Sequence, residues 1–500
     1  MTAFHDLFYG FSIAFQPWNL LSCFFGVFIG TLVGVLPGIG PVGTMSLLLP
    51  ITFGISPVTG IIMLAGIFYG AMYGGSTTSI LVNIPGEAAS VVTCLDGYQM
   101  ARQGRAGPAL GISAFSSFIA GTLSVVGLMF LADPLAALAL KFGPAEYFSL
   151  MCLGLSVLIY LTQGSILRGL VMAGIGLFLS LIGMDIITGK PRFTFGLTGL
   201  IDGVGLVPLV MGFFGISEIL INLEKLTERT LVKTKVKGLL PNKEDWRRAA
   251  KPIGRGTLLG FFLGILPGAG AITSTFVSYA LEKKLSKHPE QFGKGAIEGV
   301  AGPEAANNAA TGGALIPLFS LGIPSNVVAA LLLGALMIHG VRPGPLLLTE
   351  HPEIFWGTVA SMYVGNVLLL VLNLPLIGIW VKVLKIPYKI LFPLILLFCF
   401  IGAYSTGTNV FDLFVMLVCG ILGYLFRKLN YEPAPLVLAY VLGPMLEQNL
   451  RQALILSDGR FGVFLTRPLS AGCLIITFLL LISAALPSLQ KKRKVVISEE

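Results

Sequence analysis

The chain has 500 residues, of which 55% are hydrophobic and only 11% are charged. Soluble domains carry about 25% charged residues, so a soluble globular protein is excluded. The formal net charge of +9 would suggest nucleic-acid binding in a soluble protein, but the Lys and Arg residues are concentrated in a few loops. That distribution is typical of the cytoplasmic loops of membrane proteins.

Uncharged apolar segments begin near the N-terminus and recur along the whole chain. Residues 7–86 contain no Asp, Glu, Lys, Arg or His, and similar uncharged segments are 106–132, 147–167, 256–281, 305–338, 354–381, 390–411 and 468–490. At about 20 residues per span, they predict an all-α polytopic membrane protein with about 10–12 transmembrane segments. No basic residue precedes the first apolar segment, so we expect the N-terminus to be retained rather than cleaved as a signal peptide.

A pattern of five glycines and a Leu-Pro pair occurs twice, at an offset of 230 positions. It consists of Gly26, Gly30, Gly34, Leu36, Pro37, Gly38 and Gly40, repeated as Gly256, Gly260, Gly264, Leu266, Pro267, Gly268 and Gly270. Seven positions in register indicate a duplicated unit. We therefore expect a first transmembrane half (1–222), a basic cytoplasmic linker (223–255), a second half (256–487) and a basic cytoplasmic tail (488–500).

The positions of Lys and Arg predict the orientation of the two halves. The Pro-broken segment 256–281 lies between the basic segments 223–255 and 282–298, so it is expected to be a re-entrant hairpin with both ends in the cytoplasm. In the first half no Lys or Arg occurs before Arg102 and Arg105. This favours inverted repeats, with the first hairpin entering from the outer face and residues 58–86 crossing to the cytoplasmic side, over parallel repeats.

The repeated Leu-Pro-Gly-x-Gly motif breaks a helix inside an apolar segment. Proline removes a main-chain donor and glycine leaves helical angles, and such breaks are tolerated in membranes mainly where they line a cavity. The next half-helix begins at the break, and its N-terminal dipole favours anions. We predict substrate contacts at these positions, with a packing kink as the alternative: Pro37, Gly38, Gly40 and Thr44, and Gly268, Gly270 and Thr273.

A second polar run follows each glycine motif and ends in an Ile-Pro pair. The first copy resembles a phosphate-binding loop but lacks its lysine, so ATP binding is not expected. Packing of helices through small residues is the structural alternative. The predicted substrate-binding residues are Gly74, Gly75, Ser76, Thr77, Asn83 and Pro85 in the first half, and Asn307, Asn308, Thr311, Gly312, Gly313, Pro324, Ser325 and Asn326 in the second.

The ionisable residues near these motifs are expected to cap helices or form ion pairs, with Glu304 as the candidate for a functional charge inside the membrane. They are Glu87, Asp96, Arg102, Arg105, Glu298, Glu304 and Arg342. The four histidines are dispersed and the six cysteines form no CxxC pair. We therefore expect no enzyme. The cysteines give no information on a metal site, which stays unknown, and they are expected mostly to pack as small apolar residues.

Five segments together resemble the large membrane subunit of tripartite tricarboxylate transporters, the TctA family: 36–40, 74–86, 96–101, 266–270 and 307–325. The likeness extends over about residues 15–485. It implies uptake across a bacterial inner membrane, driven by a cation gradient, together with a small four-helix membrane subunit and a periplasmic solute-binding protein that delivers a carboxylate. No cofactor is expected; the coupling ion would be Na⁺ or H⁺.

The sequence therefore favours secondary active import, by symport, of a small organic anion of the di- or tricarboxylate class. The two pairs of breaks are expected to meet near the middle of the membrane and hold the anion. A passive anion channel and a non-transporting membrane scaffold are the alternative functions. A channel would be favoured by rings of charge or a long polar lining, whereas this chain has discrete breaks.

Overall fold

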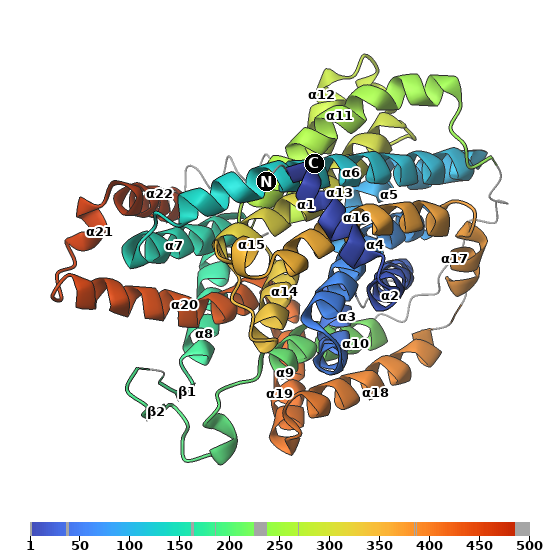
Figure 1. Cartoon of the computed structure of the whole chain (residues 1–500). Coiled ribbons are helices and arrows are strands. Elements are labelled where there is room, and N and C mark those ends of the chain that lie inside the picture. Colours follow the sequence, from blue (N-terminus) through green and yellow to red (C-terminus); the bar gives the residue numbers. More distant parts are fainter. Residues whose placement is uncertain are drawn as a thin grey trace.

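The computed structural model describes residues 3–36, 40–161, 165–185, 187–224, 238–268, 270–384, 386 and 388–485. This part of the chain is largely α-helical (Figure 1), with one antiparallel pair of short strands, β1 (Gly183–Met184) and β2 (Pro191–Arg192). Six segments in it are long and apolar enough to cross a membrane: Pro17–Val35, Pro57–Val82, Ala88–Ala139, Leu206–Glu224, Pro352–Asn373 and Val410–Lys428. The prediction of an all-α polytopic membrane protein is confirmed.

The helices of the first half begin with α1 (Ala3–Ala14), α2 (Pro17–Val35), α3 (Gly40–Leu48), the 3₁₀ segment η1 (Leu49–Gly54) and α4 (Pro57–Val82). They continue with η2 (Ala88–Ser90), α5 (Val91–Met100), the π-helical η3 (Ala101–Arg105), α6 (Ala106–Ala139), α7 (Pro144–Leu161) and α8 (Ile166–Ser180). After the strands come η4 (Thr198–Leu200), α9 (Leu206–Val210), η5 (Met211–Ile216) and α10 (Ser217–Glu224).

The later elements are α11 (Lys243–Ile265), α12 (Gly270–Leu285), η6 (Pro289–Gln291), α13 (Glu298–Leu321), α14 (Val327–Ile338), α15 (Leu347–Glu350) and α16 (Pro352–Asn373). They end with α17 (Ile377–Val383), α18 (Tyr388–Gly407), α19 (Val410–Lys428), α20 (Ala434–Leu456), α21 (Val463–Thr466) and α22 (Pro468–Ala485). Helices α7, α20, α21 and α22 lie together at one side of the molecule in Figure 1.

The two glycine stripes let the first helix of each hairpin lie directly against the long buried helix of its own half, α2 against α4 and α11 against α13. A β-carbon on any stripe glycine of α2 would lie within 2.6 Å of a carbonyl oxygen of α4, and on α11 within 2.4 Å of one of α13. The contacts are Gly26 on Met63, Gly30 on Ile67 and Gly34 on Ala71, and Gly256 on Gly302, Gly260 on Ala306 and Gly264 on Ala310. From one contact to the next, the residue number increases on both helices. Helix α2 therefore runs parallel to α4, and α11 runs parallel to α13.

Side-chain contacts identify the two ends of this assembly. At one end, the Thr52 end, the Thr52 hydroxyl lies 3.3 Å from His339 at the end of α14, and Thr59 at the start of α4 bonds Asn19 of α2. At the other, the Asp96 end, Asp96 near the end of α5 accepts N–H groups of Gly295 and Ala296, just before α13, both at 2.8 Å.

The two halves are therefore inverted in this structure. Helix α4 starts at the Thr52 end and continues past a break into α5, whereas α13 starts at the Asp96 end and continues past a break into α14. Hairpin α2–α3 has both ends at the Thr52 end, since η1 carries Thr52. Hairpin α11–α12 has both ends at the Asp96 end, where Arg255 of α11 pairs with Glu282 of α12.

The broken helices α4 and α13 form the core. All residues from Thr59 to Val82 and from Gly299 to Ser320 are buried, whereas α18, α19 and α22 expose many large apolar side chains, as lipid-facing helices do. Helix α13 is not among the apolar spans given above, because its Glu and Asn residues lower its hydropathy; these residues are tolerated because protein surrounds the helix.

Candidate substrate site

The first break of each half begins a new helix with a left-handed glycine. Gly40 has φ +65° at the start of α3, and Gly270 has φ +50° at the start of α12. The next turn is fixed alike in both copies, because the hydroxyl of Thr44 donates to the Gly40 carbonyl at 2.9 Å and that of Ser274 to the Gly270 carbonyl at 2.6 Å. Pro37 and Gly38 lie outside the described residues.

The second break is also built twice from equivalent parts. Helix α4 ends at Asn83 with φ 59°, and α13 ends at Gly322 with φ 70°. Four positions after these residues, Glu87 and Asn326 each cap the next helical segment: the Glu87 carboxylate accepts the Ala89 N–H at 2.7 Å, and the Asn326 Oδ1 accepts the Ala329 N–H at 2.9 Å.

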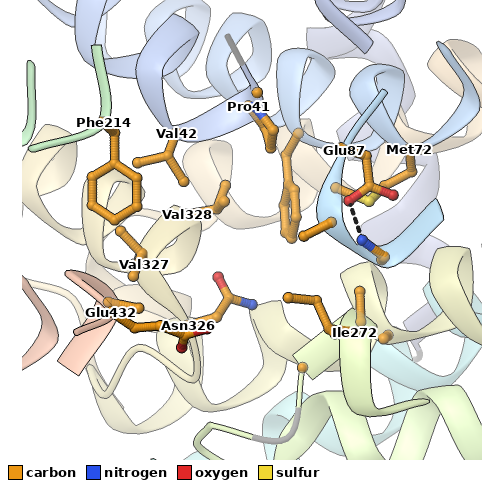
Figure 2. Close-up of a pocket in the computed structure, with 18 of the residues that line it drawn as sticks. Pro41, Val42, Met72, Glu87, Phe214, Ile272, Asn326, Val327, Val328 and Glu432 are labelled. Atoms are coloured by element: carbon orange, nitrogen blue, oxygen red, sulfur yellow. Dashed lines mark hydrogen bonds between the residues drawn. The ribbon is translucent and has the colours of Figure 1, made fainter. Parts of the chain in front are cut away.

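The breaks of both halves enclose one cavity of about 490 Å³. Its lining includes the starts of α3, α12 and α14, together with η2 and the first residue of α20. Figure 2 shows Pro41 and Glu87 on one side of this space, and Ile272, Asn326 and Glu432 on the other. The backbone bond from the Gly268 N–H to the Ser325 carbonyl, 2.8 Å long, ties the two breaks of the second half together.

The cavity brings together only part of the predicted site. The predicted residues that line it are Gly40, Pro85, Gly268, Gly270, Thr273 and Asn326. The predicted residues that do not line it are Thr44, Gly74, Gly75, Ser76, Thr77, Asn83, Asn307, Asn308, Thr311, Gly312, Gly313, Pro324 and Ser325. Asn308 and Thr311 border a separate space of about 10 Å³, which is about enough for one water.

Glu304 lies behind the cavity in a network of hydroxyl groups. Its side chain is only 1% exposed and accepts hydrogen bonds from Ser76 at 2.6 Å, from Thr93, and from Ser117 at 3.4 Å. Asn308 completes the network by donating to Ser117 at 2.7 Å. Three helices outside α13, namely α4, α5 and α6, thus contribute hydroxyls to one buried carboxylate.

The remaining charged residues near the motifs mostly behave as the sequence predicts. Arg105 pairs with Asp245, and Glu298 pairs with Arg248 at 2.7 Å. Glu87 is a cap, as expected, but it is also a wall of the cavity.

Sequence reasoning missed a group of residues at one edge of the cavity. Arg427 of α19 pairs with Glu218 of α10 and lies 5.8 Å above the ring of Phe214, and Glu432 lines the same edge. Glu218 is an acid in an otherwise uncharged apolar run, 203–223, and that signal could have identified it. Its partner Arg427 could not be identified from the sequence, because the two residues meet only through the packing of α10 against α19.

Comparison with protein families identifies the family of this chain. Residues 20–438 match the family described as the tripartite tricarboxylate transporter TctA family. An Agrobacterium vitis protein, described as an uncharacterized 52.8 kDa protein in the TAR-I ttuC' 3'region, is 53% identical over 500 residues, covering 100% of both chains. Another, described as an uncharacterized protein in the TAR-II ttuC' 3'region, is 52% identical over 241 residues, 48% of this chain and 100% of that protein.

No solved structure matches the chain. The family match covers most of the sequence, and it agrees with the multi-pass helical fold and the resemblance stated above. The chain therefore belongs to the tripartite tricarboxylate transporter TctA family, as a large membrane subunit.

Proposed function

We propose that this chain carries out secondary active, cation-coupled uptake of a small organic anion of the di- or tricarboxylate class across a bacterial inner membrane. It would work with a small four-helix membrane subunit and a periplasmic solute-binding protein. The observation that carries the proposal is the cavity in which the starts of α3, α12 and α14 meet.

Helix starts favour an anion in this cavity. The first turn of a helix has N–H groups without partners inside the helix, and its dipole is positive. Helix N-termini are therefore common sites for carboxylates and phosphates. A volume of about 490 Å³ lies within the range of small-molecule sites, roughly 300–1,000 Å³.

Arg427 offers the anion a charged partner at the edge of the cavity. Its guanidinium is held by Glu218 and stacks on Phe214. A substrate carboxylate that displaced Glu218 would form the same kind of charge-assisted hydrogen bond.

A discrete cavity between opposed hairpins favours a transporter over the alternatives. A channel needs a continuous polar path, whereas in the described residues the helix breaks meet at one discrete cavity with a mainly apolar lining. A scaffold needs no cavity, and it predicts that cavity variants leave uptake unchanged.

The test is reconstitution into proteoliposomes with radiolabelled di- and tricarboxylates. Uptake should require all three proteins and an inward cation gradient. Full uptake by the isolated chain would contradict the tripartite arrangement, and flux independent of any ion gradient would indicate a channel.

Arg427→Gln tests the site within this system. Loss of one charged hydrogen-bond partner typically costs about 1.5–3 kcal/mol, so the apparent substrate affinity should fall roughly 10- to 150-fold. The matched control is Arg460→Gln, because Arg460 is exposed and does not line the cavity. Equal affinities for the two variants would remove Arg427 from the site.

A further inference from the structure

Glu87 and Asn307 form a buried contact at the wall of the cavity. The Asn307 Nδ2 donates to Glu87 Oε1 at 3.3 Å, and the two residues are 1% and 9% exposed respectively. Glu87 lines the cavity and is labelled in Figure 2, whereas Asn307 of α13 does not line it. The contact joins the first half of the chain to the second.

The Asn307 amide uses only its nitrogen in this contact. Its Oδ1 is buried and has no hydrogen-bond partner among the described residues. Because Nδ2 faces the Glu87 carboxylate, Oδ1 of the same amide points away from it. A half-turn of the amide about its Cβ–Cγ bond exchanges the two atoms and would turn Oδ1 toward Glu87 Oε1. Buried polar atoms are normally paired, and two facing oxygens, one of them from a carboxylate, would share a cation.

The charges around this contact also indicate a place for a cation. Within the described part of the chain, neither Glu87 nor Glu304 forms an ion pair with Lys or Arg. Both oxygens of Glu304 already accept hydroxyl groups. Glu87 Oε2 accepts the Ala89 N–H, but Oε1 has only the long contact with Asn307. Since a buried carboxylate without a positive partner is unfavourable, Glu87 is the one with an oxygen left for a cation.

We propose that Glu87 and Asn307 bind a sodium ion beside the substrate cavity. Carboxylate and amide oxygens suit a hard cation, and one available carboxylate supplies the single negative charge that a monovalent ion balances. No group of three or more His, Cys, Asp or Glu in the described residues offers a transition-metal site. The inference rests on the proposed function, because it makes this ion the coupling ion.

Sodium at this place would act on the substrate through charge. Without a cation, the Glu87 carboxylate repels an organic anion in the same cavity; with Na⁺ bound, that repulsion is removed. By thermodynamic linkage the anion must tighten Na⁺ binding by the same factor. Coupling then needs no direct contact between the ion and the substrate.

The test measures binding of radioactive Na⁺ to the purified full-length chain in detergent, with choline replacing Na⁺ in the reference buffer. Wild type should bind Na⁺ saturably. Glu87→Gln and Asn307→Ala should each weaken binding about 10-fold or more, as expected for loss of an ion ligand. Gel filtration checks that each variant is folded. Weaker Na⁺ binding by either folded variant is sufficient to support the site.

Asn373→Ala is the matched control. Asn373 on α16 also has a buried Oδ1 without a partner among the described residues, but its amide donates to the Leu369 carbonyl of its own helix. It does not line the cavity, so its removal should leave Na⁺ affinity unchanged.

Absence of saturable Na⁺ binding, or unchanged affinity in both site variants, would overturn the proposal. Uptake that ignores Na⁺ but follows a proton gradient, and is altered by Glu87→Gln, would assign the residue to a proton instead and also overturn it. Uptake without Na⁺ binding would leave the proposed function standing, whereas Na⁺ binding without uptake would leave only the ion site.

Discussion

Asn83 and Gly322 end the two broken helices in the same left-handed conformation but under different constraints. Asn83 is exposed, whereas a β-carbon on Gly322 would lie 2.8 Å from the Pro343 carbonyl oxygen. The left-handed region is open to Gly and tolerated by Asn. Asn83 therefore has a backbone role that is independent of any ligand contact.

This difference predicts that the two positions respond unequally to exchange. Asn83→Gly should leave thermal stability and uptake near wild type, and Asn83→Val should cost about 1–2 kcal/mol because valine is strained there. Gly322→Asn should destabilise more than Asn83→Gly, since its β-carbon meets Pro343. Thermal unfolding in detergent gives the order, and equal effects of the two exchanges would contradict the assigned constraints.

The hydroxyl network around Glu304 predicts an energetic coupling. Thr93→Val removes a donor from a buried carboxylate and should destabilise by about 1.5–3 kcal/mol. Thr358→Val is the control, because the Thr358 hydroxyl is equally buried but bonds only the Ile354 carbonyl of its own helix. In a Glu304→Gln background the cost of Thr93→Val should shrink, and a double-mutant cycle measures that coupling. Additive effects would count against a charged Glu304.

At the scale of elements, alanine at a stripe glycine of α11 and alanine at Gly254, its glycine outside the stripe, should have opposite effects on stability. A β-carbon at Gly260 would lie 2.1 Å from the Ala306 carbonyl oxygen, whereas one at Gly254 meets nothing within 4 Å. Gly260→Ala should force α11 away from α13 and destabilise by about 1–3 kcal/mol or more, and Gly254→Ala should stabilise by about 0.4–1 kcal/mol. Thermal unfolding and the yield of folded protein check the signs. Similar behaviour of both variants would mean that α11 and α13 are not in close contact.

At the scale of the whole molecule, α6 contacts both the linker and the first helix, at two positions far apart along its length. Gly111 of α6 lies against the carbonyl oxygen of Leu239, and Phe130 contacts the ring of Phe4 at 6.1 Å between centroids. The 19 residues between them rise about 29 Å, close to the roughly 30 Å hydrocarbon thickness of a bilayer.

Cysteines introduced at residues 3 and 240 should therefore be labelled from opposite sides of the membrane. The Asp96 end carries the basic segments, so residue 240 should be cytoplasmic and residue 3 periplasmic. The measurement uses a membrane-impermeant thiol reagent on intact and lysed cells, in a variant without the native cysteines. Labelling of both positions from one side would contradict this orientation.

Much of this arrangement could be predicted from local signals in the sequence. The glycine register identified the duplicated unit, Leu-Pro-Gly-x-Gly located the hairpin tips, and the basic loops favoured inverted halves. The uncharged segment 305–338 located most of α13 and all of α14, but it could not show that protein surrounds α13 on all sides. The resemblance pointed to the family, which residues 20–438 confirm.

The edge of the cavity depends on packing between distant segments. Arg427 and Glu218 are separated by 209 positions, and no sequence period relates them. Likewise, Asn307 meets Glu87 across 220 positions. The sequence singled out Asn307 for its amide beside a predicted break, but it interpreted Glu87 only as a cap.

The second breaks also bear on descent. Glu87 and Asn326 occupy equivalent capping positions on the two halves, one acidic and one neutral. A symmetric dimer of two identical half-length chains would carry the same residue at both places, and thus an acid at both caps or at neither. A fused gene escapes that restriction, because each copy mutates separately. Fusion therefore permits an acidic cap in one copy and a neutral cap in the other, a difference that a dimer of identical half-length chains could not have had.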